Sequence, residues 1–331
     1  MTEVIPGIYQ LQLPMPPRFS EYINSYLVQG DSKYLLIDTG WNTEESFDSL
    51  KRQLAEIDVN FKDISQIVIT HSHADHYGLA SKLKQLCQAK LAVHYLEKKF
   101  INSRYTNTEG FLQQVENWLY INGGPAHELP ELRAAFREII KLVVPIFPDI
   151  TLYGNETISI GLFSFKVIWT PGHTAGHISL YEPIKKILIS GDHILSTITP
   201  NISLHPHSSD NPLGDYINSL NKVKQLDVNL ILPGHGNPFT GLQLRSEEII
   251  QHHKRRNSEI LETIKVKPKT AYQISTEITW VPDTNGVGWQ QLDSWNRVMA
   301  IMETTAHLES IRVDGKTSKF QRNGVTYYQS I

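Results

Sequence analysis

Thr70-His71-Ser72-His73-Ala74-Asp75-His76 places four side chains that can bind a metal within six positions of a 331-residue chain. The apolar run from Ile64 to Ile69 before it predicts a short buried strand. Gly78 then allows a turn, and the spacing from Leu79 to Ala89 predicts a helix. We therefore expect the cluster to lie on a loop at the end of a strand, between two rigid elements.

Neutral imidazoles and a carboxylate suit a borderline divalent metal such as zinc. The four side chains are too crowded for one ion to use all of them. His71 and His73 can point one way, while Asp75 and His76 point another. This pattern predicts two divalent metal ions side by side.

Three more candidate ligands share one setting, because each follows a predicted strand and stands beside a glycine: His173, Asp192 and His235. Strand ends of a two-layer sheet converge on one edge, so residues far apart in the chain can meet there. We expect a first metal on His71, His73 and His173, a second on Asp75, His76 and His235, and Asp192 as a bridge.

Such a site has a definite chemistry. A bound divalent metal lowers the pKa of its water from about 15.7 to about 7, which makes a nucleophilic hydroxide. The metals also polarise a carbonyl or phosphoryl oxygen of the substrate. We expect Asp75 and Asp192 to have catalytic roles, with Asp75 orienting the hydroxide or moving its proton. A serine or cysteine nucleophile is unnecessary, and Cys87 is interpreted as a core residue.

Other histidines could assist the site. His177 and His193 each neighbour a proposed ligand and could support it from behind. His205 and His207 follow Asp192 on a loop rich in proline and could reach the substrate. The remaining histidines have no supporting pattern: His94, His127, His252, His253 and His307.

Apolar patterns organise the rest of the chain. Strands are predicted over these ranges: Val4 to Leu13, Tyr22 to Val28, Tyr34 to Ile37, Lys90 to His94, Ile158 to Ile168, Ile178 to Tyr181, Ile187 to Ser190 and Asn229 to Leu232. Helices are predicted at Glu44 to Ile57, capped by Asn42 or Thr43, and at Tyr216 to Leu226. These elements predict one catalytic domain over residues 1–241.

Residues 97–147 interrupt this β-rich domain with helices only. Their aromatic side chains look exposed: Phe100, Tyr105, Phe111, Trp118 and Tyr120. The block is either a helical cap over the site or an insertion whose aromatics pack against the main body. A further composition shift begins near Leu242. Three helices there, followed by a hairpin over Arg312 to Lys319 and Gly324 to Gln329, predict a winged-helix module over residues 242–331.

Composition excludes several classes of protein. The net charge of −3 is too near neutral to indicate an electrostatic field that attracts nucleic acid or a membrane surface. One cysteine forbids an internal disulfide framework and fits a reducing compartment. No apolar segment approaches the roughly 20 residues that span a bilayer, and no secretory signal is visible. We expect a cytoplasmic protein without a membrane partner.

Taken together, the motifs resemble the metallo-β-lactamase superfamily: the histidine-rich loop, the Pro-Gly-His turn at 171–173, Gly-Asp at 191–192 and Gly-His at 234–235 follow the family's order. The resemblance covers residues 4–240 and implies an α/β fold, a four-layer αββα sandwich with the site on one edge. Zinc is the family's default metal, with iron and manganese as alternatives. Asp38 matches an early aspartate that supports the metal loop; its residue pattern alone fits either a cleft residue or a turn carboxylate.

Two branches of the superfamily are most similar to this chain. Thr170 to Tyr181 resembles the glyoxalase II branch, and the C-terminal third resembles the subgroup of the β-lactamase-like protein 2 endoribonucleases. Gly191 to Leu195 with Thr199 to Asn201 is similar to bacterial zinc-dependent hydrolases. Antibiotic β-lactamases match poorly, because most have another residue in place of Asp192. Glutathione is not implied, because a winged helix replaces the extension that binds it.

Three functions follow: an ester or thioester hydrolase for a small or medium acyl substrate, an endoribonuclease or phosphodiesterase, and a nucleic-acid-binding regulator. A helix that reads DNA carries several basic residues toward phosphates. The predicted helix from Trp295 to Ile311 has Arg297 but also Glu303 and Glu309, so the sequence favours the first function. We expect the winged-helix module to shape the substrate cleft or to support a homodimer.

Overall fold

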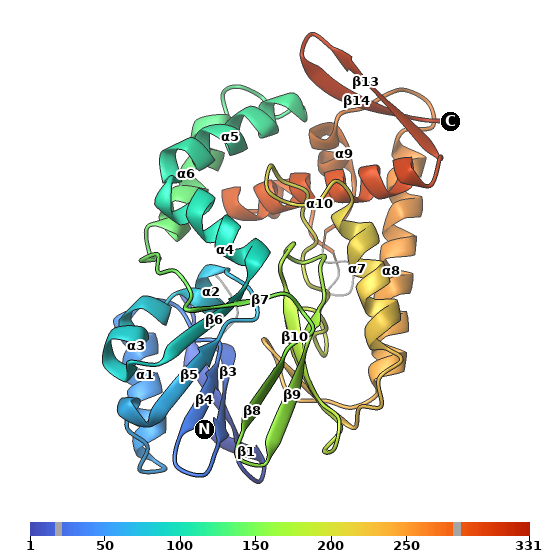
Figure 1. Ribbon diagram of the computed structural model, residues 1–331. Coiled ribbons are helices and arrows are strands. Elements are labelled where there is room, and N and C mark those ends of the chain that lie inside the picture. The colour runs from blue at the N-terminus through green and yellow to red at the C-terminus, as the bar shows by residue number, and fades with distance from the viewer. Residues whose placement is uncertain (17–21, 281–285) are drawn as a thin grey trace.

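The computed structural model describes residues 1–16, 22–280 and 286–331, and it contains two β-sheets packed face to face (Figure 1). The first sheet joins its strands in chain order: β1 (Thr2–Ile5), β2 (Ile8–Pro14), β3 (Tyr22–Gln29), β4 (Tyr34–Ile37), β5 (Ile64–Val68), β6 (Lys90–His94) and β7 (Ile150–Leu152). The second sheet has the order β12 (Leu230–Pro233), β11 (Ile187–Gly191), β10 (Ile178–Glu182), β9 (Phe163–Trp169) and β8 (Thr157–Ile160).

Helices cover the outer face of each sheet and complete the predicted αββα sandwich. On the first sheet, α1 (Glu44–Ala55) and α3 (Ala80–Cys87) bury Leu50 and Leu83 in a shared apolar core. On the second, α7 (Pro212–Val223) and α8 (Leu242–Thr263) do the same with Leu220 and Ile249. A third core lies between the sheets, with Val28 and Val68 on one side and Phe165 and Leu180 on the other.

Parallel pairing brings the functional strand ends to one edge of the sandwich. β4, β5 and β6 run parallel in the first sheet, and β11 runs parallel to β12 in the second. β9 and β11 both pair antiparallel with β10, so β9 points the same way as β11. The segments that follow these strands therefore leave the sheets on the same side, where their side chains can meet.

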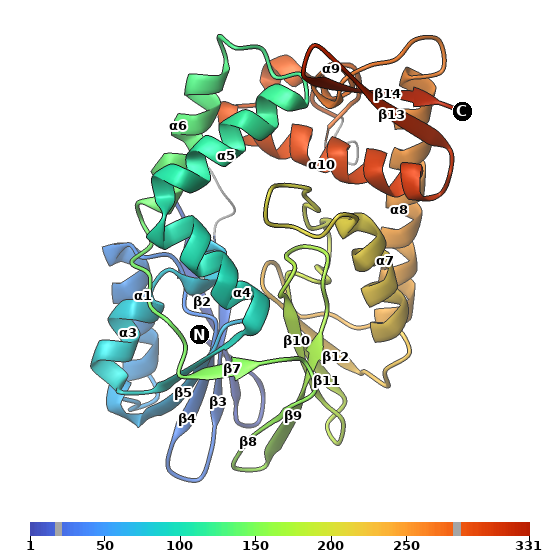
Figure 2. The same ribbon diagram turned by 45° about the horizontal axis from the view of Figure 1, so that its top comes forward.

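Two helical units stand above this edge (Figure 2). The insertion after β6 contains α4 (Tyr95–Ile101), a π-helical turn at Asn102–Thr106, α5 (Thr108–Ile121) and α6 (Leu129–Ile140). The C-terminal region contains α8, α9 (Ala271–Glu277), α10 (Ser294–Val313) and an antiparallel hairpin of β13 (Thr317–Arg322) and β14 (Val325–Ser330). This order of elements is compatible with the winged-helix prediction.

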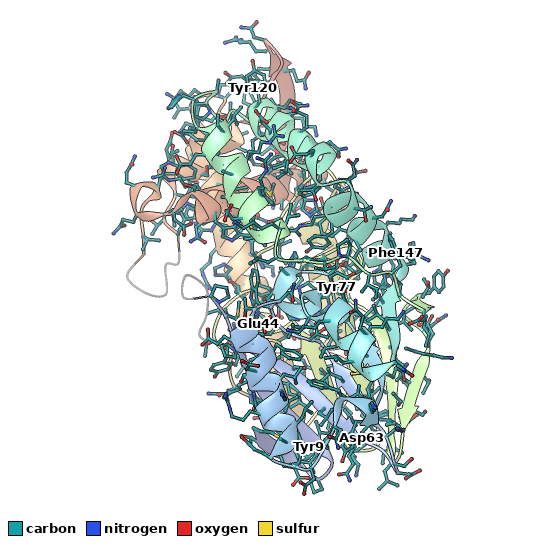
Figure 3. The ribbon with its side chains drawn as sticks, turned by 90° about the vertical axis from the view of Figure 1, so that its left-hand side faces the viewer. Tyr9, Glu44, Asp63, Tyr77, Tyr120 and Phe147 are labelled. Carbon is teal, nitrogen blue, oxygen red and sulfur yellow. The ribbon has the colours of Figure 1, made fainter. Side chains whose placement is uncertain are left out.

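The aromatic residues of the insertion are more buried than the sequence indicated. Phe100, Tyr105 and Phe111 are each under 9% exposed, so their predicted exposure is wrong. Tyr120 is 47% exposed and stands at the outer end of the insertion (Figure 3). Some of the buried aromatics pack within the insertion, where Phe111 contacts Phe100 and Phe136 edge to face. Tyr105 packs against the main body instead, because it stacks on Tyr77 and donates to the carbonyl of Ser72 (2.8 Å).

Several predicted boundaries need correction, and turn residues explain most of them. The range Val4 to Leu13 is two strands, because the chain turns at Gly7, which has a φ of 85°. Ile158 to Ile168 is the hairpin of β8 and β9, with its turn at Gly161 (φ 51°). Arg312 lies in the last turn of α10, so the final hairpin begins later than predicted.

The helix predicted at Glu44 is present, and Thr43 caps it by accepting a hydrogen bond from the Ser46 amide (3.2 Å). Across the described residues, none of the helices combines the length and the apolar character that crossing a bilayer requires.

Candidate metal centre

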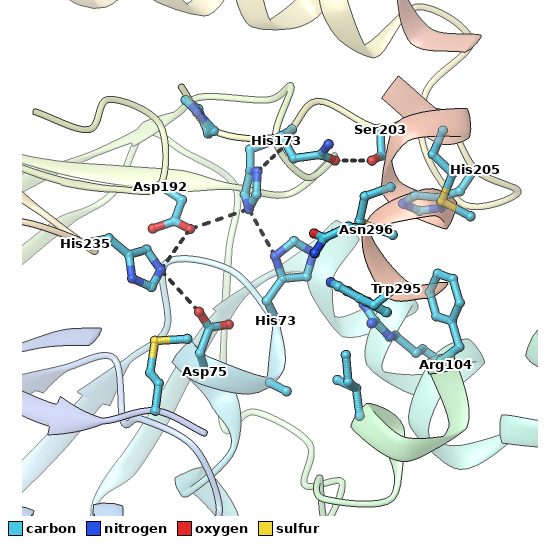
Figure 4. A pocket seen from close by; sticks show the side chains of 18 of the residues that line it. His73, Asp75, Arg104, His173, Asp192, Ser203, His205, His235, Trp295 and Asn296 are labelled. Carbon is cyan, nitrogen blue, oxygen red and sulfur yellow. Dashed lines mark hydrogen bonds and ion pairs between the residues drawn. The ribbon is translucent and has the colours of Figure 1, made fainter. Parts of the chain in front are cut away.

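The seven residues proposed as ligands meet at the edge of the sandwich. Figure 4 labels those that also line the neighbouring cavity: His73, Asp75, His173, Asp192 and His235. The first sheet supplies four of them after β5, and the second sheet supplies the others after β9, β11 and β12: His71, His73, Asp75 and His76, then His173, Asp192 and His235. Asp75 and His76 lie on a short helix, α2 (Ala74–Tyr77), so the expectation of a loop throughout this stretch is wrong for its second half. The helical turn faces them toward residues of the second sheet.

The first cluster consists of His71, His73 and His173. Nδ1 of His73 lies 3.0 Å from Nε2 of His71 and 3.0 Å from Nε2 of His173. Ligand atoms of a tetrahedral zinc ion with bonds of about 2.1 Å are about 3.4 Å apart, so the spacing fits such an ion. Burial, followed by neighbouring imidazoles, holds the pKa of His71 and of His73 well below the usual range. The rings are therefore neutral, which is the form that binds metal.

The second cluster consists of Asp75, His76 and His235. Oδ2 of Asp75 lies 3.2 Å from Nε2 of His235 and 3.6 Å from Nε2 of His76. These separations are again close to those between neighbouring ligands of one tetrahedral ion. The sequence assigned these two groupings to separate metals. A third grouping, of His71, His76 and Asp192, overlaps both, so the division between two metals stays a prediction.

Asp192 faces both clusters. Its Oδ1 is 3.4 Å from Nε2 of His76, and its Oδ2 is 3.4 Å from Nε2 of His235 and 3.8 Å from Nε2 of His173. Nε2 of His76 and Oδ1 of Asp192 are buried and approach each other only at 3.4 Å, and neither makes a well-formed hydrogen bond among the described residues. Buried polar atoms of this kind require a partner. A divalent ion between the carboxylate and the imidazoles would provide it.

Charge also favours cations at the second cluster. Burial lowers the pKa of His235, but the carboxylates of Asp192 and Asp75 outweigh it and raise that pKa to about 10. Burial raises the pKa of Asp192, but His235 and His76 reverse the shift and hold it well below its usual range. Two buried carboxylates thus attract positive charge strongly, and a metal ion competes with protons for the same atoms.

Groups behind the candidate ligands fix their orientation. Nδ1 of His76 donates to Oδ2 of Asp38 (2.7 Å), which leaves Nε2 free to bind a metal. The same carboxyl group accepts from the amide and the hydroxyl of Thr70, both at 2.8 Å. Asp38 therefore supports the metal loop, as the resemblance implied. It is not among the described residues that line the cavity, and the amide that it binds belongs to the loop after β5 and not to its own turn. His173 is held similarly, because its Nδ1 donates to the carbonyl of Asn201 (2.8 Å).

The neighbouring histidines have different positions. His177 lies behind Asp192, whose amide donates to Nε2 of His177 (3.1 Å). His193 is buried, and its ring nitrogens make no hydrogen bond within the described part of the chain. His205 lines the cavity beside the clusters, whereas His207 lines a smaller neighbouring pocket.

Glu97 is a component that the sequence did not indicate. It opens the helical insertion, is 1% exposed, and joins the two loops that carry the first cluster. Its Oε2 accepts from the amide and the hydroxyl of Ser72, and its Oε1 accepts from the Thr174 hydroxyl (2.6 Å) and the Gly176 amide (3.0 Å). Because the donors lie about 25 and 80 positions away, no local pattern reveals this bridge.

A cavity of about 430 Å³ adjoins the clusters and receives side chains from three parts of the chain. The edge of the sandwich that carries the clusters contributes His73, Asp75 and His235. The insertion contributes Phe100, Phe111 and Arg104, and α10 contributes Trp295, Asn296 and Met299. Most of this wall is apolar. The insertion is therefore a wall of the cavity as well as a packed unit, so both alternatives stated for it hold in part.

Comparison with known proteins agrees with this geometry. The family model described as the metallo-beta-lactamase superfamily matches residues 20–235. The probable metallo-hydrolase YqjP of Bacillus subtilis is 27% identical over 333 residues, covering 98% of this chain and 98% of YqjP. Hydroxyacylglutathione hydrolase GloC of Haemophilus influenzae is 27% identical over 235 residues, which are 69% of this chain and 92% of GloC.

The likeness extends to a solved structure over the full length. The metallo-beta-lactamase family protein TTHA1429 from Thermus thermophilus is 29% identical, with a TM-score of 0.83, covering 99% of this chain and 100% of that chain. The insertion and the C-terminal helices thus fall within the matched region. With its αββα layers and its histidine and aspartate clusters at one edge, this chain belongs to the metallo-beta-lactamase superfamily.

Proposed function

We propose that this protein hydrolyses an ester or thioester of a small or medium acyl group with two divalent metal ions, Zn²⁺ by preference. The observation that carries the proposal is the apolar cavity that adjoins both candidate metal clusters. An acyl chain can be buried there while its carbonyl carbon lies at the clusters. The names of two relatives support the same chemistry: YqjP is called a probable metallo-hydrolase, and GloC is called a hydrolase of hydroxyacylglutathione, in which an acyl group is joined to sulfur.

The proposed roles follow from position. His71, His73 and His173 would hold one ion, Asp75, His76 and His235 would hold the other, and Asp192 lies near both sets. When bound, such ions supply a nucleophilic oxygen at neutral pH and draw electrons from the substrate carbonyl. Asp75 also faces the cavity, so its carboxyl group can orient the attacking oxygen and take its proton. Asp38 and Glu97 keep the ligands in place.

Phosphodiester hydrolysis is the second candidate, because the same ions can act on a phosphoryl centre. The charge distribution argues against it. Two of the basic side chains of the C-terminal hairpin region, Arg312 (2.6 Å) and Lys319 (2.7 Å), pair with the buried carboxylate of Glu309 instead of facing a binding surface. A surface that binds nucleic acid presents such cations to phosphates.

The test is a panel of acyl thioesters, lactones, phosphodiesters and single-stranded RNA, each with and without chelator. We expect chelator-sensitive turnover of thioesters or esters. Asp192→Ala should lose bound metal and at least about 100-fold in kcat/KM while keeping its circular dichroism spectrum. Asp227→Ala removes an exposed aspartate that pairs with Lys186 and serves as the control. RNA cleavage without ester turnover would favour the phosphodiesterase, and unchanged metal content in Asp192→Ala would refute the bridging role.

A further inference from the structure

The helical insertion places a buried arginine in the wall of the cavity. Arg104 lies in the π-helical turn and is 5% exposed, and Figure 4 shows it beside Trp295, on the far side of His73 from His235. Among the described residues, no carboxylate lies within ion-pair distance of it, and its Nε makes no hydrogen bond. The other arginines of the insertion differ, because Arg133 and Arg137 pair with glutamates at 2.7–2.9 Å.

The surroundings of Arg104 only partly stabilise its charge. Its guanidinium carbon lies 5.2 Å from the ring centre of Phe100, 5.7 Å from that of Phe111 and 6.0 Å from that of Phe136. Cation–π contacts contribute about 0.5–2 kcal/mol each, whereas removing an ion from water costs several kcal/mol even after relaxation.

Two titratable groups described near Arg104 do not supply a negative charge. Burial, followed by Arg104 itself, lowers the pKa of His205 to about 3, so this imidazole is neutral. Burial raises the pKa of Tyr105 to about 12, so its hydroxyl keeps its proton. A buried cation that has no counter-charge within the described ranges, directed into a cavity beside the candidate metal clusters, is poised for an anion from outside.

We propose that Arg104 binds a carboxylate on the substrate, so that the substrate is an ester or thioester whose apolar acyl chain ends in a carboxylate. This inference rests on the proposed function and specifies its substrate class. The planar guanidinium can bind both oxygens of a carboxylate. The aromatic side chains around Arg104 would enclose the methylene groups between the carboxylate and the reacting carbonyl.

The first experiment measures binding without turnover. The zinc-loaded protein is titrated by calorimetry with α,ω-dicarboxylates of four to ten carbons and with monocarboxylates of the same lengths. One carboxylate of each ligand can bind at the metals. Any additional affinity of the dicarboxylate then measures the binding of its second carboxylate to Arg104. We expect a chain length at which the dicarboxylate binds at least about 10-fold more tightly than its monocarboxylate partner. Equal binding at every length would overturn the proposal.

Variants separate Arg104 from the rest of the cavity. Arg104→Met should remove the preference for dicarboxylates, Arg104→Lys should retain part of it, and Arg133→Met, on the same insertion, should leave it intact. Arg104→Met should also unfold at a temperature no lower than the wild type, because it removes an uncompensated buried charge. A marked loss of thermal stability would indicate a structural cation instead, as would a retained dicarboxylate preference in Arg104→Met.

A second experiment separates this proposal from the proposed function. Matched thioesters are compared, each with a methyl or a carboxylate at the end of the same acyl chain. We expect a lower KM for the carboxylate form in the wild type and equal KM values in Arg104→Met. Hydrolysis of both forms with equal KM values in the wild type would overturn the anion site alone. If neither is hydrolysed while dicarboxylate binding depends on Arg104, the hydrolase proposal fails and the anion site stands.

Discussion

A single carboxyl group connects the two loops of the first histidine cluster. Glu97 accepts four hydrogen bonds, two from Ser72 and two from the segment after His173. It is not a candidate metal ligand. It acts by holding the loop of His71 and His73 at a fixed position relative to the loop of His173. Groups that orient metal ligands typically change metal affinity 10- to 100-fold when they are replaced.

We therefore expect Glu97→Gln to lower zinc affinity about 10- to 100-fold, because its amide group cannot accept from all four donors. The measurement is competition with a chromophoric zinc chelator. Glu109→Gln, an exposed site on the same insertion, serves as the control. Equal zinc affinity in Glu97→Gln and the wild type would show that the bridge does not position the ligands.

The candidate ligands could be predicted from the sequence because each follows an apolar strand and lies in a short, unusual pattern. The structure brings all seven together, while their binding of metal stays a prediction. Glu97 and Arg104 could not be predicted in this way. Each lies in a helix of ordinary composition, and its importance comes from atoms that only the folded chain brings near it.

Helix α10 links the C-terminal region to the edge that carries the candidate metal ligands. Its Glu303 accepts a hydrogen bond from the side chain of Asn201 (2.6 Å), and the carbonyl of Asn201 accepts from Nδ1 of His173 (2.8 Å). Burial raises the pKa of Glu303 to about 7, although Arg256 and the Asn201 amide favour its charged form. His307 on the same helix lies 4.0 Å away, and its own pKa is held well below the usual range, mainly by burial.

This raised pKa makes a contribution to stability that depends on pH. Between about pH 4.5 and 7 the folded protein keeps a proton on Glu303 that the unfolded chain releases, so the free energy of unfolding falls as pH rises. Glu303→Gln cannot titrate. The stability of the wild type relative to this variant should thus fall by up to about 3 kcal/mol between pH 5 and 8.5.

The effect is measured by urea unfolding of the wild type and Glu303→Gln across this pH range, after metal has been removed from both. The candidate ligands then titrate alike in the two proteins, so their contribution cancels in the difference. Asp314→Asn, at the exposed end of α10, gives the background for removing a carboxylate. A difference between wild type and Glu303→Gln that stays constant with pH would contradict the raised pKa.

Elements were predicted more reliably than their ends. The strand β5 and the helix α1 follow from clear apolar periods. The predicted strand from Val4 to Leu13 failed because Gly7 and Pro6 turn the chain without interrupting the apolar pattern around them. The spacing of apolar residues therefore identifies which residues are buried. The local backbone conformation decides where an element ends.

The cavity is a property of the whole molecule. Its walls come from the sandwich edge, the insertion and α10, so no one segment of sequence describes it. Trp295 of α10 contacts Phe136 of α6 with ring centres 4.9 Å apart, which closes the wall between the two helical units. The aromatic residues that the sequence identified in the insertion could not be placed, because their partners lie up to about 200 positions away.

The two sheets also meet at the candidate metal site, and this arrangement has a consequence for stability. The first sheet carries His71, His73, Asp75 and His76, and the second carries His173, Asp192 and His235. Ions bound by both sets would hold the halves of the sandwich together. A ligand that binds only the folded state at 1,000 times its dissociation constant stabilises it by about 4 kcal/mol.

Removing the metal with a chelator should therefore lower the thermal midpoint of the wild type by about 5–10 °C, and added Zn²⁺ should restore it. Asp192→Ala should show a much smaller shift, because the group between the two clusters is missing. Circular dichroism melts with parallel metal analysis provide the measurement. A midpoint that does not move once the ions are shown to be gone would mean that the ligands hold the two sheets together equally well without them.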